Sequence, residues 1–221
     1  MHRFPAHLIA LLIATVVAVA PLSAQDDPQA QALLGKVSDQ MKQYASFHAE
    51  YSSKMVDRQS DLEMDQMGEV WIKGDQYHLK LGDYVIICDG ITVWTYEPEM
   101  GECYIDDAGA IAEDGVDPAK MFTIWEDGFK KVWKGEVTEK GRVLSRVDLH
   151  PEGSEERSFH TIQCLIDQKS LQVVRLVVKG REGTDVVYDV ESFEGNAAIP
   201  SGAFKFDAAQ YPGTTMIDNR L

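Results

Sequence analysis

The spacing of apolar residues changes from a helical to a strand period near residue 47. Before that point, large side chains recur at helical intervals, which predicts an amphipathic helix of about 17 residues: Leu33, Leu34, Val37, Met41 and Tyr44. Asp27 followed by Pro28 is typical of a helix start, because the acid caps free N–H groups and proline fits the first turn. From Phe47 onward apolar and polar residues alternate, as in a strand with one buried face.

Ten or eleven strand-like segments follow at spacings of about 8 to 13 residues, separated by turn sequences such as Asp89-Gly90. Helices do not alternate with these segments, which argues against a parallel sheet. A sheet made of this many consecutive hairpins curls on itself. The pattern therefore predicts a mainly β (α+β) fold built on a single curved antiparallel sheet.

A second helical segment interrupts the strands. Residues 106–115 are acidic and small, which predicts a loop, and Asp117-Pro118 repeats the capping pattern. The segment from Met121 to Phe129 is apolar nearly all round, more than a surface helix needs. We expect both helices to lie across the concave side of the sheet. Because two helices leave part of that apolar face uncovered, the pattern predicts a sheltered apolar cavity with a movable lid.

Residues 1–24 are typical of a cleaved signal peptide. A charged start precedes the apolar run from Leu8 to Ala20, and small residues at Ser23 and Ala24 predict cleavage after Ala24. A membrane anchor is the alternative, but an anchor needs about 18 to 20 uninterrupted apolar residues, and Pro21 ends this run. We therefore expect an exported, periplasmic protein in which residues 25–221 form one domain.

The net charge and the cysteines further narrow the possible classes of protein. Lys and Arg number 21 against 36 Asp and Glu, which gives a formal net charge of −15 and argues against a nucleic-acid partner. Of the three cysteines, Cys88 and Cys103 fall in predicted strands with another strand between them, too far apart for a disulfide. With Cys164 they are expected to be buried thiols.

The search for catalytic chemistry finds no catalytic residue, metal site or cofactor. The histidines that follow residue 24 lack the spacing of a zinc site; they are His48, His78, His150 and His160. The common nucleophile and phosphate-binding motifs are missing as well. The acidic loop around Asp106 and Asp107 lacks the ligand pattern of a calcium-binding loop. An enzyme is kept as an alternative class, but the pattern favours a binding protein.

Six segments between Leu33 and Arg220 follow one another in a specific order and spacing: LLGKVSDQMKQYASFHAEY, GEVWIK, CDGITVWTYEPE, DPAKMFTIW, LHPEGSEERSFHTIQCLIDQKSLQVVRLVV and FKFDAAQYPGTTMIDNR. In this order and spacing the chain resembles the LolA-type outer-membrane lipoprotein carrier proteins of the bacterial periplasm. This resemblance implies an unclosed β-barrel of about eleven strands with an α-helical lid over an apolar cavity. It further implies that acylated lipoproteins are the cargo and that an inner-membrane ABC transporter complex is the donor. The outer-membrane acceptor is unknown, and we expect a monomer because a shuttle must diffuse.

The expected cavity lining combines strand and lid residues: Tyr51, Val70, Ile72, Leu79, Ile86, Trp94, Tyr96, Met121, Ile124 and Trp125. One departure from the family pattern concerns the lid. Family members carry Lys-Arg-Pro after the strand that resembles GEVWIK, and that Arg helps to hold the lid closed, whereas this chain has Lys73-Gly74-Asp75. A binder of another lipid or hydrophobic ligand, using the same cavity, is the alternative to a lipoprotein carrier.

Overall fold

The computed structural model describes residues 26–109, 118–139, 141–153 and 157–220. The predicted signal peptide lies outside the described residues, as does most of the predicted acidic loop. None of the helices in the described part of the chain is long and apolar enough to span a bilayer.

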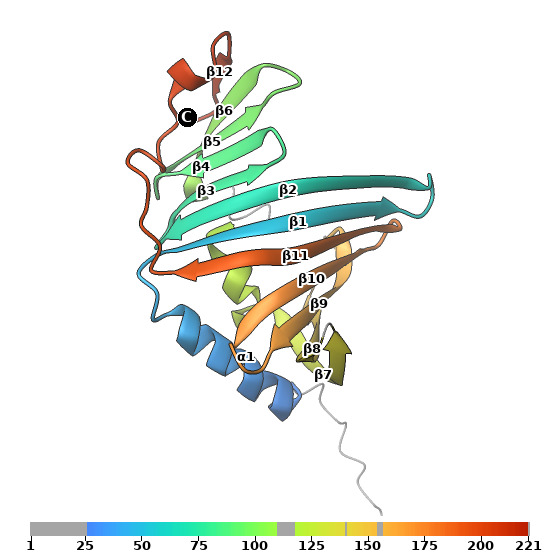
Figure 1. Ribbon diagram of the computed structural model, residues 1–221. Coiled ribbons are helices and arrows are strands. Elements are labelled where there is room, and N and C mark those ends of the chain that lie inside the picture. Colours follow the sequence, from blue (N-terminus) through green and yellow to red (C-terminus); the bar gives the residue numbers. More distant parts are fainter. Residues whose placement is uncertain (1–25, 110–117, 140, 154–156, 221) are drawn as a thin grey trace, which may run out of the picture.

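Within these residues the strands form one sheet (Figure 1). The strands are β1 (Phe47–Asp57), β2 (Leu62–Lys73), β3 (Gln76–Leu81), β4 (Tyr84–Cys88), β5 (Thr92–Glu97), β6 (Glu102–Asp107), β7 (Phe129–Glu139), β8 (Arg142–Pro151), β9 (Phe159–Asp167), β10 (Gln172–Gly180), β11 (Thr184–Gly195) and β12 (Thr215–Asp218). Their order is β12-β6-β5-β4-β3-β2-β1-β11-β10-β9-β8-β7, so the sheet remains open between β12 and β7. This confirms the predicted unclosed sheet. The twelfth strand arises because β12 adds to the edge of β6, in the one parallel pairing of the described sheet.

The first helix, α1 (Pro28–Met41), begins where the capping pattern predicts. The Asp27 carboxylate accepts the N–H of Gln29 at 2.9 Å, and proline occupies the first turn. The helix ends at Met41, before the predicted Tyr44, whose ring instead lies over Gly195 on β11. The buried apolar side of α1 packs on the sheet through Leu34 and Val37.

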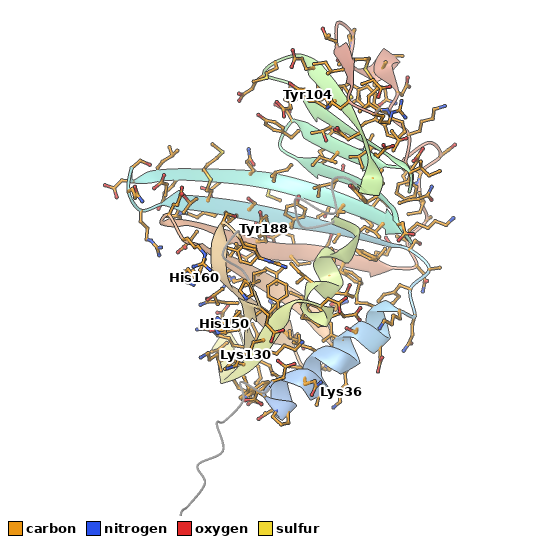
Figure 2. All side chains as sticks on the ribbon, turned by 180° about the vertical axis from the view of Figure 1, so that it is seen from behind. Lys36, Tyr104, Lys130, His150, His160 and Tyr188 are labelled. Atoms are coloured by element: carbon orange, nitrogen blue, oxygen red, sulfur yellow. The ribbon has the colours of Figure 1, made fainter. Side chains whose placement is uncertain are left out.

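The second helical segment, η1 (Pro118–Glu126), consists of 3-10 turns joined by a kink at Thr123. Its Trp125 indole N–H donates to the Ser38 hydroxyl of α1 at 2.9 Å, so the two helical segments are held together. Both pack on the same face of the sheet, as predicted, and Figure 2 views the molecule from that side. We call this the inner face and the opposite one the outer face.

The buried apolar side chains of the described residues form three clusters. The first lies between α1, η1 and the inner face of β7–β10, and the second lies between η1 and the inner face of β1–β5. The third is on the outer face of β4–β6, beneath Phe206 and Tyr211 of the C-terminal segment. The rings of Phe206 and Tyr211 stack with centroids 4.9 Å apart. The C-terminal segment therefore covers part of the outer face.

The cysteine prediction is confirmed: Cys88, Cys103 and Cys164 are buried and unbridged. Removal from water raises the pKa of the Cys103 thiol to about 11. Burial likewise raises the pKa of Cys164, with the nearby Asp148 carboxylate adding to the shift. Thiols held in this state are poor nucleophiles and poor metal ligands.

Candidate ligand-binding face

The strand register decides which side chains share the inner face. Val70 on β2 lies opposite Leu79 on β3, which lies opposite Ile86 on β4. Ile72 lies in the neighbouring row, opposite Phe47 of β1, and Tyr51 faces Gly68 across the β1–β2 pair. Directly paired residues point to the same side of a sheet. Five of the predicted cavity residues are thus brought together on one face.

The predicted residues differ in how far they are covered. Val70 and Ile72 are buried in the second cluster, where Phe122 of η1 packs edge-on against Phe47 with ring centroids 4.9 Å apart. Leu79 and Ile86 are only partly buried at the edge of that cluster. These two keep apolar surface that a ligand can reach, whereas Val70 and Ile72 act mainly as packing residues.

Two of the three predicted lid residues pack in the interior. Trp125 is 1% exposed and packs with α1 and β7–β10, and Ile124 packs against the same cluster. Both therefore anchor η1 to the interior. The side chain of Met121 lies outside the described residues.

Trp94 and Tyr96 require a correction, because they lie on the outer face. Trp94 pairs with Ile87 and Tyr96 pairs with Val85, which belong to the cluster beneath Phe206. The inner positions of β5 go to Val93 and Thr95 instead, since neighbouring residues of a strand point to opposite sides. Bulky aromatic residues were expected in the cavity, but here they support the C-terminal segment.

The apolar inner face continues beyond the cover of the helical segments, toward the far ends of β1, β2 and β11. Met55 of β1 lies opposite Met64 on β2 and Val186 on β11, and Val186 lies opposite Val178 on β10. Met64 is 43% exposed, and the other three are partly buried. Of these residues, Met55 could have been placed on the inner face from the sequence, because it follows Tyr51 at an even spacing along the same strand.

Two tyrosines stand at the border between the covered and the open parts of this face. The ring centroids of Tyr51 and Tyr188 are 6.0 Å apart at an interplanar angle of 65°. The Tyr51 hydroxyl donates to the carbonyl oxygen of Lys80 at 3.2 Å. Burial raises the pKa of both phenols, and in Tyr51 the neighbouring Tyr188 adds to the rise. Both side chains remain neutral at any physiological pH.

An ion pair fastens η1 to the end of α1. Lys42 Nζ lies 2.9 Å from a carboxylate oxygen of Glu126. The hydrogen bond from Lys42 holds the pKa of Glu126 below its ordinary value, although partial burial opposes the shift. Within the described residues, no ion pair joins Lys73 or Asp75 to η1, and Gly74 adopts a φ of +58° in the β2–β3 turn. Lys42 and Glu126 therefore add one polar contact between η1 and the end of α1, at a different place from the β2–β3 turn, where the resemblance puts the family's arginine latch.

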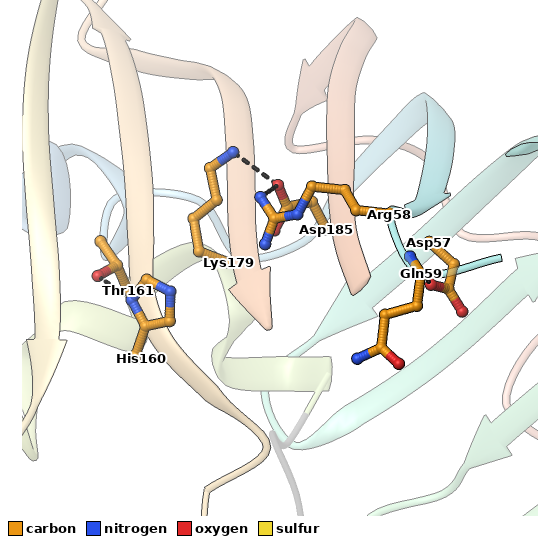
Figure 3. Close-up of polar contacts among 7 residues, drawn as sticks. All are labelled: Asp57, Arg58, Gln59, His160, Thr161, Lys179 and Asp185. Atoms are coloured by element: carbon orange, nitrogen blue, oxygen red, sulfur yellow. Dashed lines mark hydrogen bonds and ion pairs between the residues drawn. The ribbon is translucent and has the colours of Figure 1, made fainter. Parts of the chain in front are cut away.

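The polar residues around Thr161 and Asp185, at one end of the outer face, do not form a catalytic triad (Figure 3). The Thr161 hydroxyl contacts His160 Nδ1 at 2.9 Å and His150 Nδ1 at 3.2 Å. The buried Asp185 is bonded to Arg58 and Lys179, at 2.9 and 2.8 Å, and to neither histidine. A hydroxyl nucleophile needs a histidine base that an acid orients. In the described part of the chain, no group of three or more metal-binding side chains occurs either.

A shallow depression of about 300 Å³ lies along the outer surface of β11, β1 and β2. Its lining is mixed, with Lys54, Asp65 and Asp189 beside Met67 and Val187. Such charges make it a poor site for hydrocarbon chains. The inner face remains the better candidate for an apolar ligand.

Comparisons with known proteins agree with this architecture. The chain is similar to the crystal structure of an uncharacterized conserved protein from Thermus thermophilus, with a TM-score of 0.56 and 12% identity over 87% of this chain and 99% of that one. It is also similar to the Mycobacterium tuberculosis lipoprotein LppX, with a TM-score of 0.50 and 11% identity over 79% and 99% of the two chains. A comparison with curated proteins finds no match. At these identities the structural likeness shows the fold alone.

The family assignment comes from a match between the sequence and a family model. The model of the family described as outer membrane lipoprotein carrier protein LolA matches residues 42–207, about three quarters of the 221 residues. The matched region runs from the end of α1 to the C-terminal segment on the outer face, and it contains both η1 and strands β1 to β11. The chain therefore belongs to the LolA family of outer membrane lipoprotein carrier proteins.

Proposed function

We propose that this protein is a periplasmic carrier that binds the acyl chains of lipoproteins on its inner face and shuttles them from the inner to the outer membrane. One observation carries the proposal: the inner face stays apolar beyond α1 and η1, from Leu79 and Ile86 on one side to Met55 and Val186 on the other. Membership of the LolA family supports the same function.

The energetics suit a carrier better than a permanent receptor. Each buried CH₂ group contributes about 0.8 kcal/mol, so two or three chains of about 16 carbons would nominally exceed the practical limit of affinity. Release therefore requires an incomplete fit or a lid that costs free energy to close. Flexible methionines such as Met55 and Met64 adapt to chains of different shape without a tight fit.

The proposal includes the route of the cargo. Residues 1–24 would direct export and be removed, and an inner-membrane ABC transporter complex would hand over the acylated lipoprotein. The acceptor at the outer membrane is unidentified, and the carrier would act as a monomer without a cofactor. Catalysis has no place in this function.

Release of lipoproteins from spheroplasts tests the proposal. Spheroplasts that display newly made lipoproteins on the inner membrane are incubated with the purified protein, and released lipoprotein is measured in the supernatant. We expect release by the unchanged protein and little release by Leu79→Glu, which places a charge on the inner face. Trp94→Glu is the matched variant on the outer face and should retain release if it remains folded. No release by the unchanged protein would contradict the proposal.

A second candidate, a carrier of another lipid on the same face, is favoured by the β2–β3 turn. Gly74 and Asp75 stand where family members have the arginine and proline of the lid latch, so the lid and its cargo can differ. Identification of lipid that co-purifies from the native periplasm separates the two candidates. A triacylated peptide supports the lipoprotein carrier, whereas a free lipid or glycolipid supports the second candidate.

A further inference from the structure

The inner face contains a hydrogen-bond donor that the protein itself does not use. Tyr188 of β11 lies opposite Ser53 on β1 and Leu176 on β10, and its ring packs against the first apolar cluster. Within the described residues, the Tyr188 ring also contacts the ring of Tyr51, and its hydroxyl has no hydrogen-bond partner in the protein, although this hydroxyl is not among the polar atoms that are fully withdrawn from solvent. Figure 2 shows Tyr188 from the side that carries the helical segments.

Tyr51 is a natural reference for Tyr188, because the two phenols are neighbours with different bonding. The Tyr51 hydroxyl is satisfied by the Lys80 carbonyl at 3.2 Å. The Tyr188 hydroxyl has no such acceptor in the described part of the chain and remains accessible to solvent. An apolar ligand that covers this hydroxyl displaces water from it, which costs free energy unless the ligand itself supplies an acceptor.

The surroundings of Tyr188 define the acceptor that would reach it. The neighbouring inner positions are apolar or small: Ser53, Met55, Leu176, Val178 and Val186. The charged neighbours Asp185 and Asp189 occupy outer positions of the same strand. An ionic headgroup is therefore disfavoured beside Tyr188, whereas a neutral carbonyl attached to a hydrocarbon chain satisfies both the apolar surface and the hydroxyl.

We propose that the Tyr188 hydroxyl donates a hydrogen bond to the ester carbonyl of a bound acyl chain and thereby selects acyl esters over hydrocarbons of the same length that lack a carbonyl. This inference rests on the proposed function, in which acyl chains occupy the inner face. It adds a specificity-determining residue to a surface that is otherwise apolar.

Paired lipids and paired variants test the role of Tyr188. The purified protein is titrated with dipalmitoylglycerol and with its diether analogue, which has the same chains without carbonyls, and both compete against a fluorescent acyl probe. We expect the unchanged protein to bind the ester about 3- to 10-fold more tightly than the ether, as one hydrogen bond in an apolar site provides. Tyr188→Phe should bind both lipids with the affinity of the ether.

Tyr211→Phe is the control, because it removes a phenol hydroxyl from the outer face, and it should keep the preference for the ester. Thermal unfolding of each variant checks that it is folded. An ester preference that survives in Tyr188→Phe, or that is missing from the unchanged protein while both lipids bind, overturns the inference and leaves the proposed function standing. Binding of neither lipid by the unchanged protein overturns both.

Discussion

The ring of Tyr51 lies over Gly68, its cross-strand neighbour on β2, so closely that the glycine cannot carry a side chain. A Cβ built on Gly68 would overlap Tyr51 Cζ and would lie 2.7 Å from the carbonyl oxygen of Lys80. Because one of the two obstacles is backbone, a simple rotation of the tyrosine does not relieve the clash. Gly68 thus fixes the position of Tyr51 at the border of the open inner face.

Gly68→Ala should therefore destabilise the protein and disturb the inner face. We expect the free energy of unfolding to fall by about 1–3 kcal/mol, the usual range for an added methyl group in a packed site. Urea denaturation followed by tryptophan fluorescence measures the change. Gly35→Ala in α1 is the control, because a Cβ there meets no atom within 4 Å, and it should leave stability equal or slightly higher. Equal stability of Gly68→Ala and the unchanged protein would contradict the packing described.

The two exposed methionines of β2 provide a matched test of which face binds acyl chains. Met64 lies on the inner face opposite Met55, and Met67 lies on the outer face opposite Ser52. Both are exposed, at 43% and 61%, so lysine at either position leaves folding nearly unchanged. We expect Met64→Lys to weaken binding of a fluorescent fatty-acyl probe several-fold and Met67→Lys to leave it unaltered. Equal effects would argue against the inner face as the binding surface.

The start of α1 and the existence of most strands were predictable because their signals are local. Capping by Asp27 and alternation along β1 depend on neighbouring residues alone. The end of α1 depends on tertiary structure, since Tyr44 leaves the helix to cover Gly195 of β11. Such a contact joins residues about 150 positions apart and has no local signal.

The phase of the strands was harder to predict than their existence. Trp94 and Tyr96 were assigned to the cavity, but the outer face at β5 is covered by Phe206, which is more than 100 residues distant. Tyr188 was overlooked for another reason. A bulge at Glu191 shifts the register of β11, so that Phe193 and Tyr188 share the inner face although simple alternation separates them.

The buried thiols should react only when the protein unfolds. Since the pKa of Cys103 is raised to about 11, roughly one molecule in a thousand carries its thiolate at pH 8. We expect a chromogenic disulfide reagent to label less than one thiol per native molecule within minutes and three thiols in guanidinium chloride. Rapid labelling of the native protein would show that the clusters around these cysteines open readily.

The pair between Lys42 and Glu126 should make the attachment of η1 depend on pH. The hydrogen bond from Lys42 lowers the pKa of Glu126 below its ordinary value near 4.5, so its stabilising effect is present above that value and is lost as the pH falls through the lowered pKa. The bond to Glu126 raises the pKa of Lys42 above 10.5, so its effect is present below that value and is lost as the pH rises through the raised pKa. The pair is therefore intact between about pH 5 and pH 10.

Amide hydrogen exchange in η1 measures this attachment. After correction for intrinsic rates, we expect exchange in residues 122–126 to increase between pH 6 and pH 3 and, at pH 6, to increase with salt, because both side chains are accessible to solvent. Glu126→Gln should show faster exchange at pH 6 and lose most of its dependence on pH. Lys54→Met removes a different surface ion pair, with Glu63, and should leave exchange in η1 as it is in the unchanged protein. Identical exchange profiles for Glu126→Gln and the unchanged protein would mean that the apolar contacts of Phe122 and Trp125 alone hold η1 in place.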